Sequence, residues 1–243
     1  MKLSGKTALV TGGATGIGLG VAVALAQEGC HVAIAGRRED KLREAAKGFR
    51  GSPALCYHAA DVGDLKSVES LIDWATNELG PLDILVNSAG VNVLRRTLAE
   101  LSPEDWDLMM RINATGAFYC LRSVLPRMRE RRDGLIVNIS SIAGKRSSLL
   151  GGIGYTASKF AMSAASITAA REEAQYGIRI TNIYPGEVDT PILEHRPQPV
   201  SDEHRARILK PDYVAAAVLM VACLPPRAHI PELIIKPTSQ DYC

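Results

Sequence analysis

The sequence predicts an α/β fold in which a doubly wound parallel sheet of about seven strands carries helices on both faces. Short apolar runs alternate with longer segments of helical period from the beginning of the chain to its end. The apolar runs lack polar alternation, which is typical of strands buried on both faces of a parallel sheet. No linker or repeat divides the 243 residues, so we expect a single domain over 1–243.

The individual elements follow from run length and periodicity. Seven short apolar runs predict strands at 7–12, 31–36, 54–62, 82–90, 134–141, 178–186 and 231–237. Helical periodicity predicts helices at 17–28, 39–48, 64–79, 103–131, 156–176 and 211–224. The stretch 191–211 holds four prolines and mixed charges, and it is expected to be an irregular loop that borders a substrate or, alternatively, only connects two elements. Ligands of this fold class bind at the carboxyl ends of the strands.

Composition limits the classes of function. Apolar residues make up 47% of the chain, charged residues 22%, and the formal net charge is +2. No basic stripe suggests nucleic acid, and the longest apolar helical run, 213–224, is too short to span a bilayer. Five cysteines without a CxxC pair favour neither a disulfide framework nor a metal site. Without an apolar leader segment either, a soluble cytoplasmic protein is expected.

A glycine-rich turn follows the first predicted strand. The segment "TGGATGIG" at 11–18 opens the first predicted helix. Glycine permits a sharp turn and a close approach of backbone to ligand, and a helix N-terminus offers unpaired N–H groups to a pyrophosphate. Its place at the head of a strand–helix–strand unit favours a nucleotide site at Gly12, Thr15, Gly16, Ile17 and Gly18 over a tight turn without a ligand.

The end of the second predicted strand bears on the choice of nucleotide. An NAD site often has an acidic residue there, about 20 residues after the glycine turn. This chain has Gly36 instead, followed by Arg37 and Arg38. An arginine at this place attracts the additional phosphate of NADP. The pattern favours NADP(H), with NAD(H) as the alternative because Glu39 could still reach a ribose.

A tyrosine and a lysine lie four positions apart in "YTASK", residues 155–159. Positions i and i+4 share one face of a helix, so the side chains of Tyr155 and Lys159 can meet. A neighbouring cation favours the phenolate, so Lys159 is expected to lower the pKa of Tyr155. Such a pair has the properties of an acid/base catalyst if a substrate lies beside it.

Together these motifs resemble the short-chain dehydrogenase/reductase family over nearly the whole chain. The resemblance is carried in order by "TGGATGIG", "DV" at 61–62, "NSAG" at 87–90, "RINATGAF" around Asn113, "NISS" at 138–141, "YTASK" and "PGEVDTP" at 185–191. Ser88 departs from it, since a second asparagine is frequent there. The resemblance implies a Rossmann fold and an NADP(H)-dependent oxidoreductase that transfers a hydride between nicotinamide and a carbonyl or secondary alcohol.

The resemblance also implies catalytic roles. Tyr155 would be the general acid in reduction and the general base in oxidation, and Lys159 would tune it, bind the nicotinamide ribose and join a proton relay. Ser141 would hydrogen-bond the substrate oxygen, with its neighbour Ser140 as the alternative. Asn113 would hold a water that links the lysine to solvent.

Further cofactor contacts follow from the same resemblance. Their expected places are the adenine, the floor beneath the cofactor and the nicotinamide end. The residues, in that order, are Asp61 and Val62; Asn87, Ala89 and Gly90; and Pro185, Gly186, Val188 and Thr190.

The substrate is less defined by the sequence. The pocket is expected to be lined by Asn92, Val93, Leu94, Ala143, Leu149, Ile153 and Glu187. Positive charge near its mouth, serving an acidic substrate or simply solvated, would come from Lys145, Arg146, His195, Arg196, Arg205 and Arg207. The tail at 224–242 resembles that of NADP-dependent 3-hydroxy acid dehydrogenases, which favours a small hydroxy acid or semialdehyde.

Alternatives stay open at this stage. They are a 3-oxoacyl-thioester reductase of the same family, a non-catalytic dinucleotide-sensing regulator, and a scaffold protein. The resemblance further implies a homotetramer or homodimer formed through the helices at 103–131 and 156–176. Core packing explains most of the apolar positions there, which include Phe118, Leu121, Leu125, Phe160 and Ile167.

Overall fold

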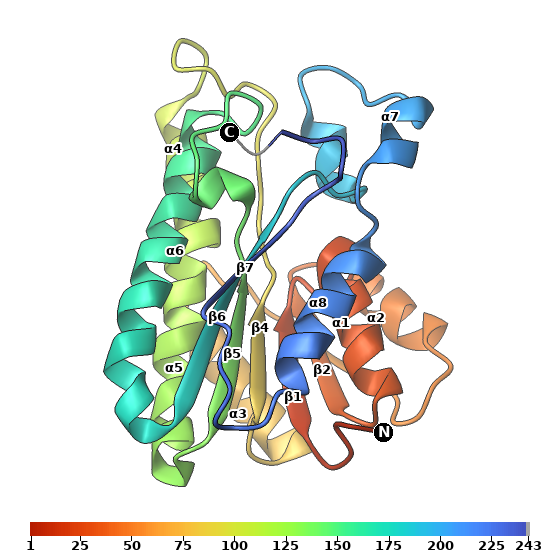
Figure 1. Cartoon of the computed structure of the whole chain (residues 1–243), viewed down its shortest axis with the longest axis vertical. Helices are drawn as coiled ribbons and strands as arrows, with labels where there is room; N and C mark the ends of the chain where they lie inside the picture. The colour runs from red at the N-terminus through yellow and green to blue at the C-terminus, as the bar shows by residue number, and fades with distance from the viewer. Residues whose placement is uncertain (242–243) are drawn as a thin grey trace.

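The computed structural model describes residues 1–241 and contains one seven-stranded sheet (Figure 1). All strands are parallel, in the order β3-β2-β1-β4-β5-β6-β7. They are β1 (Thr7–Thr11), β2 (His31–Gly36), β3 (Cys56–Ala59), β4 (Ile84–Asn87), β5 (Gly134–Ile139), β6 (Ile178–Pro185) and β7 (Glu232–Ile235). The predicted fold class and all seven predicted strands are confirmed.

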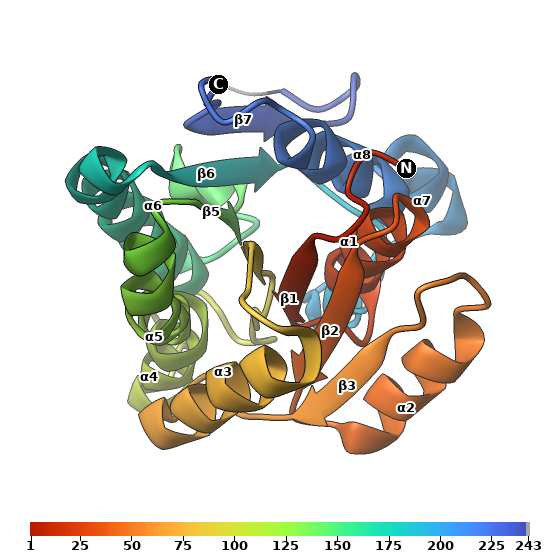
Figure 2. The ribbon, with the colours of Figure 1, turned by 90° about the horizontal axis from the view of Figure 1, so that it is seen from below.

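Helices cover both faces of the sheet, as Figure 2 shows. On one face lie α1 (Gly16–Gln27), α2 (Glu39–Gly48) and α8 (Pro211–Ala222), and on the other α3 (Leu65–Leu79), α4 (Pro103–Met109), α5 (Gly116–Arg131) and α6 (Ile153–Glu173). The short α7 (Asp202–Arg207) lies beyond the sheet. The architecture is a Rossmann-like single domain with two helical layers.

The central strands explain why both layers form. Leu9 and Val10 are adjacent on β1 and fully buried, yet Leu9 belongs to the hydrophobic cluster under α3 and α5 while Val10 belongs to the cluster under α1 and α8. Successive side chains of a strand point to opposite faces. A strand whose inner residues are all apolar therefore needs an apolar layer on each side.

The prediction of one continuous helix at 103–131 is wrong. A π-helical turn, Met110–Thr115, separates α4 from α5. It contains Asn113, whose side chain is bonded to the backbone of Val91 rather than turned to solvent. Gly116 follows the turn, and a Cβ there would lie 2.9 Å from Val62 Cγ2. Polar anchoring and close packing thus interrupt a helix whose periodicity looks continuous.

The segment 191–211 is also more ordered than predicted. It contains a 3₁₀ turn, Pro191–His195, in addition to α7 and the beginning of α8. The Ser201 side chain caps α7 by accepting a hydrogen bond from the His204 N–H at 3.2 Å. Short elements in a proline-rich stretch have too few residues to show a helical period in the sequence.

Three observations from residues 1–241 bear on the class of protein. None of the helices there has the length and apolar character needed to cross a membrane. The same residues contain no cluster of three histidine, cysteine or acidic side chains that could hold a metal. Cys30, Cys56, Cys120 and Cys223 are free thiols, and Cys243 lies outside the described residues.

Candidate active site

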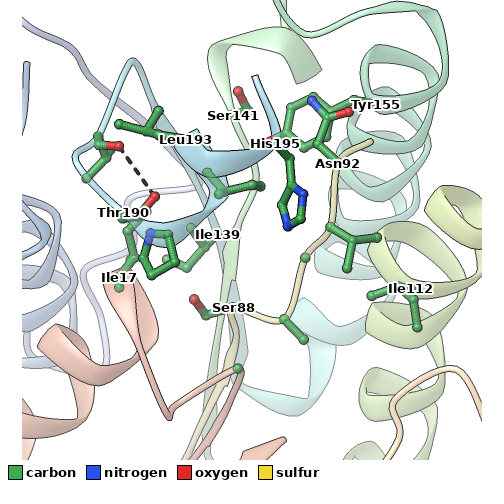
Figure 3. Close-up of a pocket in the computed structure, with 18 of the residues that line it drawn as sticks. Ile17, Ser88, Asn92, Ile112, Ile139, Ser141, Tyr155, Thr190, Leu193 and His195 are labelled. Atoms are coloured by element: carbon green, nitrogen blue, oxygen red, sulfur yellow. Dashed lines mark hydrogen bonds between the residues drawn. The ribbon is translucent and has the colours of Figure 1, made fainter. Parts of the chain in front are cut away.

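A cleft of about 930 Å³ lies at the carboxyl ends of the strands. Segments that follow the first six strands, β1 to β6, form its walls, together with the 191–196 segment. The sheet order places β1 between β2 and β4, so the connections from these strands diverge to opposite faces and leave a crevice. Figure 3 shows some of the residues that line it, among them Ile17, Ser141 and Tyr155.

Most of the predicted site residues line this cleft. Those that line the cleft are Gly12, Thr15, Gly16, Ile17, Gly18, Arg37, Arg38, Asp61, Val62, Ala89, Gly90, Ser141, Tyr155, Lys159, Pro185, Gly186, Val188 and Thr190. Two predicted residues, Asn87 and Asn113, lie beneath the wall instead.

The glycine turn has the shape of an anion cradle. Gly12 and Gly16 have positive φ, 66° and 56°, and a Cβ on Gly12 would lie 2.7 Å from the Ala89 nitrogen. Thr15 at the N-cap of α1 makes no capping hydrogen bond, whereas Asp64 caps α3 by accepting from the Ser67 N–H at 2.7 Å. The uncapped N–H groups of α1 are therefore available to a phosphate, so the turn fits a dinucleotide.

The far end of the cleft carries two free cations. Arg37 and Arg38 are exposed, follow β2, and line the cleft beside Gly36. Neither forms an ion pair within the described part of the chain, in contrast to Lys41, which is bonded to Glu44. The cleft therefore offers positive charge at this end without an acidic residue at the strand terminus.

Tyr155 and Ser141 lie near each other at the other end of the cleft (Figure 3), and Lys159 lines the cleft beside Tyr155. Tyr155 and Lys159 share a face of α6 as predicted, with Lys159 Nζ 5.8 Å from the centroid of the Tyr155 ring. Ser141 follows β5, its hydroxyl accepts the Ala143 N–H at 3.1 Å, and it lies close enough to the phenol to lower the pKa of Tyr155. The Ser140 hydroxyl is directed elsewhere, 3.0 Å from that of Ser163. Of the two serines, Ser141 is therefore the one whose side chain acts on Tyr155.

The predicted effect of Lys159 on Tyr155 is not found in this structure. Burial raises the pKa of Tyr155, while the hydrogen bond with Ser141 and the charge of Arg96 act in the opposite direction. Burial also lowers the pKa of Lys159 to about 8, and its Nζ donates to the Ile139 carbonyl oxygen at 2.8 Å. The expectation was wrong because low solvent exposure disfavours both charged forms.

Asn113 and Asn87 support the floor of the cleft. The Asn113 amide accepts from the Val91 N–H at 2.8 Å and donates to the Val91 carbonyl and the Ser158 hydroxyl, each at 2.9 Å. These bonds use both amide hydrogens, so the second lone pair of Oδ1 is the position of this side chain left for a water. Asn87 donates to Asn138 Oδ1 at 2.9 Å and is 2% exposed, so it holds β4 against β5.

The predicted substrate pocket is correct in part. Asn92, Val93, Leu94, Ala143 and Glu187 line the cleft. Leu149 and Ile153 do not, and their side chains are 102% and 41% exposed. The segment before α6 turns these two residues outward, a reversal that sequence spacing does not reveal.

Only two of the six cations predicted at the mouth line the cleft, namely His195 and Arg196. Lys145 is bonded to Glu232 at 2.6 Å, Arg205 to Asp189, and Arg207 to Glu203. Arg146 also lies outside the lining. Local carboxylates therefore neutralise much of the positive charge that was expected at the mouth of the cleft.

Sequence reasoning missed three residues that line the cleft. Arg95 and Arg96 line the cleft from the loop after β4, and Gln240 lines it from the C-terminal segment. Gln240 Oε1 accepts the Glu187 N–H at 2.9 Å, which joins the tail to the end of β6. The only signal for the arginines was their position directly after "NVL" at 92–94, close to a predicted strand end.

Comparisons with known proteins identify the family of the chain. The family model of the short chain dehydrogenases matches residues 6–200. Glycine betaine reductase ATRR of Emericella nidulans is 36% identical over 245 residues, which is 98% of this chain and only 19% of that protein. An uncharacterized oxidoreductase of Staphylococcus saprophyticus is 33% identical over 98% of this chain and 99% of its own length.

Among solved structures, the closed form of serine dehydrogenase complexed with NADP⁺ matches with a TM-score of 0.88 and 31% identity, covering 97% of this chain and 96% of that one. The chain therefore belongs to the short-chain dehydrogenase/reductase family. It is an oxidoreductase of the class that acts on CH–OH groups with NAD(P).

Proposed function

We propose that this protein is an NADP(H)-dependent oxidoreductase that interconverts a carbonyl group and a secondary or primary alcohol. The observation that carries the proposal is the meeting of Tyr155, Ser141 and Lys159 at one end of a cleft whose other end is the glycine turn. A phosphate cradle without an acid/base group would serve binding alone, and the combination supports catalysis.

Ser141, Tyr155 and Lys159 have distinct roles in the proposed reaction. Ser141 donates a hydrogen bond to the carbonyl oxygen and supports the negative charge that develops there. Tyr155 transfers its proton to that oxygen, and Lys159, whose pKa is lowered to about 8, can return a proton to the phenolate at neutral pH. The nicotinamide supplies the hydride to the carbonyl carbon when it is bound. In oxidation Tyr155 acts as the base.

Replacing Tyr155 with phenylalanine tests this assignment. The variant keeps the ring and loses the proton, so turnover should fall by about 10²-fold or more while NADPH binding persists. The measurement is NADPH oxidation with a panel of short aldehydes, ketones, semialdehyde acids and an acetoacetyl thioester, together with NADPH fluorescence titration. Unchanged turnover would refute the role of Tyr155. Binding of NADPH without turnover of any carbonyl by the wild type would favour the sensor alternative.

The proposed preference for NADP(H) depends on Arg37 and Arg38. Because both arginines line the cleft and lack a carboxylate partner, they are free to bind the additional phosphate. Arg37→Asp should weaken NADPH binding by about 10- to 100-fold and NADH binding much less. The exposed Arg43 on α2 gives the matched control as Arg43→Asp. Equal affinity of wild type and Arg37→Asp for NADPH would overturn the preference.

Three further features complete the proposal. The 191–211 segment acts as the substrate loop of a single domain that spans 1–243.

The protein forms a homotetramer or homodimer, which the exposed side chains of Phe118 and Phe160 support. It works in a reducing compartment such as the cytoplasm, because its four described cysteines are unpaired.

A further inference from the structure

One buried arginine in the cleft has no opposite charge beside it. Among residues 1–241 the buried charged side chains are Arg96, Lys159 and Glu173, with 6%, 4% and 1% exposure. Glu173 is paired with Arg129, and Lys159 belongs to the acid/base group. Arg96 forms no ion pair with any described residue, although a buried guanidinium is ordinarily paired with a carboxylate.

The contacts of Arg96 leave donors unused. Its Nη1 donates to the Leu150 carbonyl oxygen at 2.9 Å, and its Nη2 donates to the His195 carbonyl oxygen. Its Nε has no acceptor in the described residues. A guanidinium carries five N–H donors, so two backbone carbonyls satisfy neither its hydrogen bonds nor its charge.

Neighbouring charges in the cleft do not compensate it. Arg196 is close enough to act on Arg96 and has its own partner, Glu187, at 2.8 Å. Burial and the like charge of Arg196 lower the pKa of Arg96, and only Tyr155 acts in the opposite direction. Asp105 and Glu194 also line the cleft, but neither is paired with Arg96. A bound anion would supply the missing charge.

The position of Arg96 relates such an anion to the reacting group. Tyr155 lies within electrostatic reach of Arg96, and both line the cleft. Gly152 at the start of α6 has φ of 79°, and a Cβ there would lie 2.6 Å from Arg96 Cβ. The turn that begins the helix of Tyr155 is thus packed directly on Arg96. An anionic group bound here would lie a short distance from a carbonyl held by the phenol.

We propose that Arg96 binds the carboxylate of the substrate, so that the protein acts on small carbonyl acids and the corresponding hydroxy acids. The inference rests on the proposed oxidoreductase function and specifies its substrate. Arginine suits this role because its planar fork matches a carboxylate. The same guanidinium donates through Nη2 to the His195 carbonyl oxygen in the 191–195 turn. Arg96 would therefore contact both the substrate carboxylate and this turn.

Arg96 could instead be only a strut between two loops, and the test must separate the two roles. Arg96→Gln removes the charge while it keeps a donor for a backbone carbonyl. Arg95→Gln is the matched control, because Arg95 lines the same cleft but is exposed. The substrates are succinic semialdehyde and acetoacetate, each compared with its uncharged methyl ester and measured by NADPH oxidation.

Anion recognition predicts a selective loss. The kcat/KM of Arg96→Gln should fall by about 10- to 100-fold for the acids and by roughly 3-fold or less for the esters, mainly through KM, and Arg95→Gln should change neither by more than roughly 3-fold. Equal losses for acid and ester would mean a strut and would overturn the proposal. So would a wild type that prefers the esters.

A binding measurement keeps this inference separate from the proposed function. If the wild type reduced none of the carbonyls, the oxidoreductase assignment would fail for these classes. Arg96 would then be tested by titrating succinate and acetate into the NADP⁺-loaded protein by calorimetry. Binding by the wild type that Arg96→Gln abolishes and Arg95→Gln retains would support the proposal, and absence of carboxylate binding by the wild type would refute it.

Discussion

At the scale of single residues, the deep end of the cleft holds positive charge where burial disfavours it. Lys159 and Arg96 are both nearly inaccessible to water, and neither has a carboxylate partner in residues 1–241. A group like this destabilises the fold unless a ligand compensates it. These two buried charges lower the folding stability, and both side chains line the same cleft. Such a cost in stability is typical of active sites.

Lys159 allows this conflict to be measured. Its pKa is about 8 in the folded protein against an ordinary 10.5, so the unfolded chain binds more protons between these values and the Lys159 contribution to stability rises with pH there. In Lys159→Met this contribution is absent. The stability advantage of the variant over the wild type should be largest below pH 8, about 3 kcal/mol as an upper bound, and should shrink toward pH 10.5.

Urea unfolding of both proteins across this pH range provides the measurement. Burial raises the pKa of Cys30, Cys56, Cys120 and Cys223, which makes the stability of each protein fall as pH rises. That effect is common to both and cancels in the difference. A difference independent of pH would show that burial does not depress the pKa of Lys159.

At the scale of elements, two carboxylates that follow β6 hold the 191–211 segment. Glu187 accepts hydrogen bonds from Arg196 at 2.8 Å and contacts His204 at 2.7 Å, and Asp189 is paired with Arg205 and Lys210. Each carboxylate therefore joins two positions of the segment to the end of β6. An isolated parallel bridge between Leu209 of the segment and Val188 adds a backbone connection at the same place.

Glu187→Gln should loosen this segment. Burial alone would raise the pKa of Glu187, but the hydrogen bonds from His204 and Arg196 lower it overall, so the wild-type carboxylate is charged at neutral pH. Its loss should speed hydrogen exchange of the 196–208 amides and raise KM by roughly 3- to 10-fold. Glu203→Gln is the control, since its pair with Arg207 is exposed and contributes little. Identical hydrogen exchange in both variants would contradict the proposed role of Glu187 in ordering the segment.

At the scale of the whole molecule, the sequence predicts most of what periodicity and turn chemistry determine. The seven strands, the glycine turn and the Tyr155–Lys159 face of α6 follow from spacings of two to four residues. The π-helical turn at Asn113, the outward direction of Leu149 and the burial of Arg96 depend on segments far apart in the chain. Such contacts leave no local pattern, because tertiary packing decides them.

The assembly can be tested by the apolar surface of α5 and α6, which lie side by side on one face of the sheet (Figure 2). Leu121 and Leu125 are buried in the core as expected, but Phe118 and Phe160 are 47% and 42% exposed. Two large aromatic side chains on adjacent helices favour an interface with a second copy. Phe160→Glu would place a charge in that interface and should lower the mass of the particle to that of a smaller assembly. Light scattering after gel filtration measures this, with the exposed Arg43→Glu on α2 as the control, and a wild type that is monomeric would refute the interface.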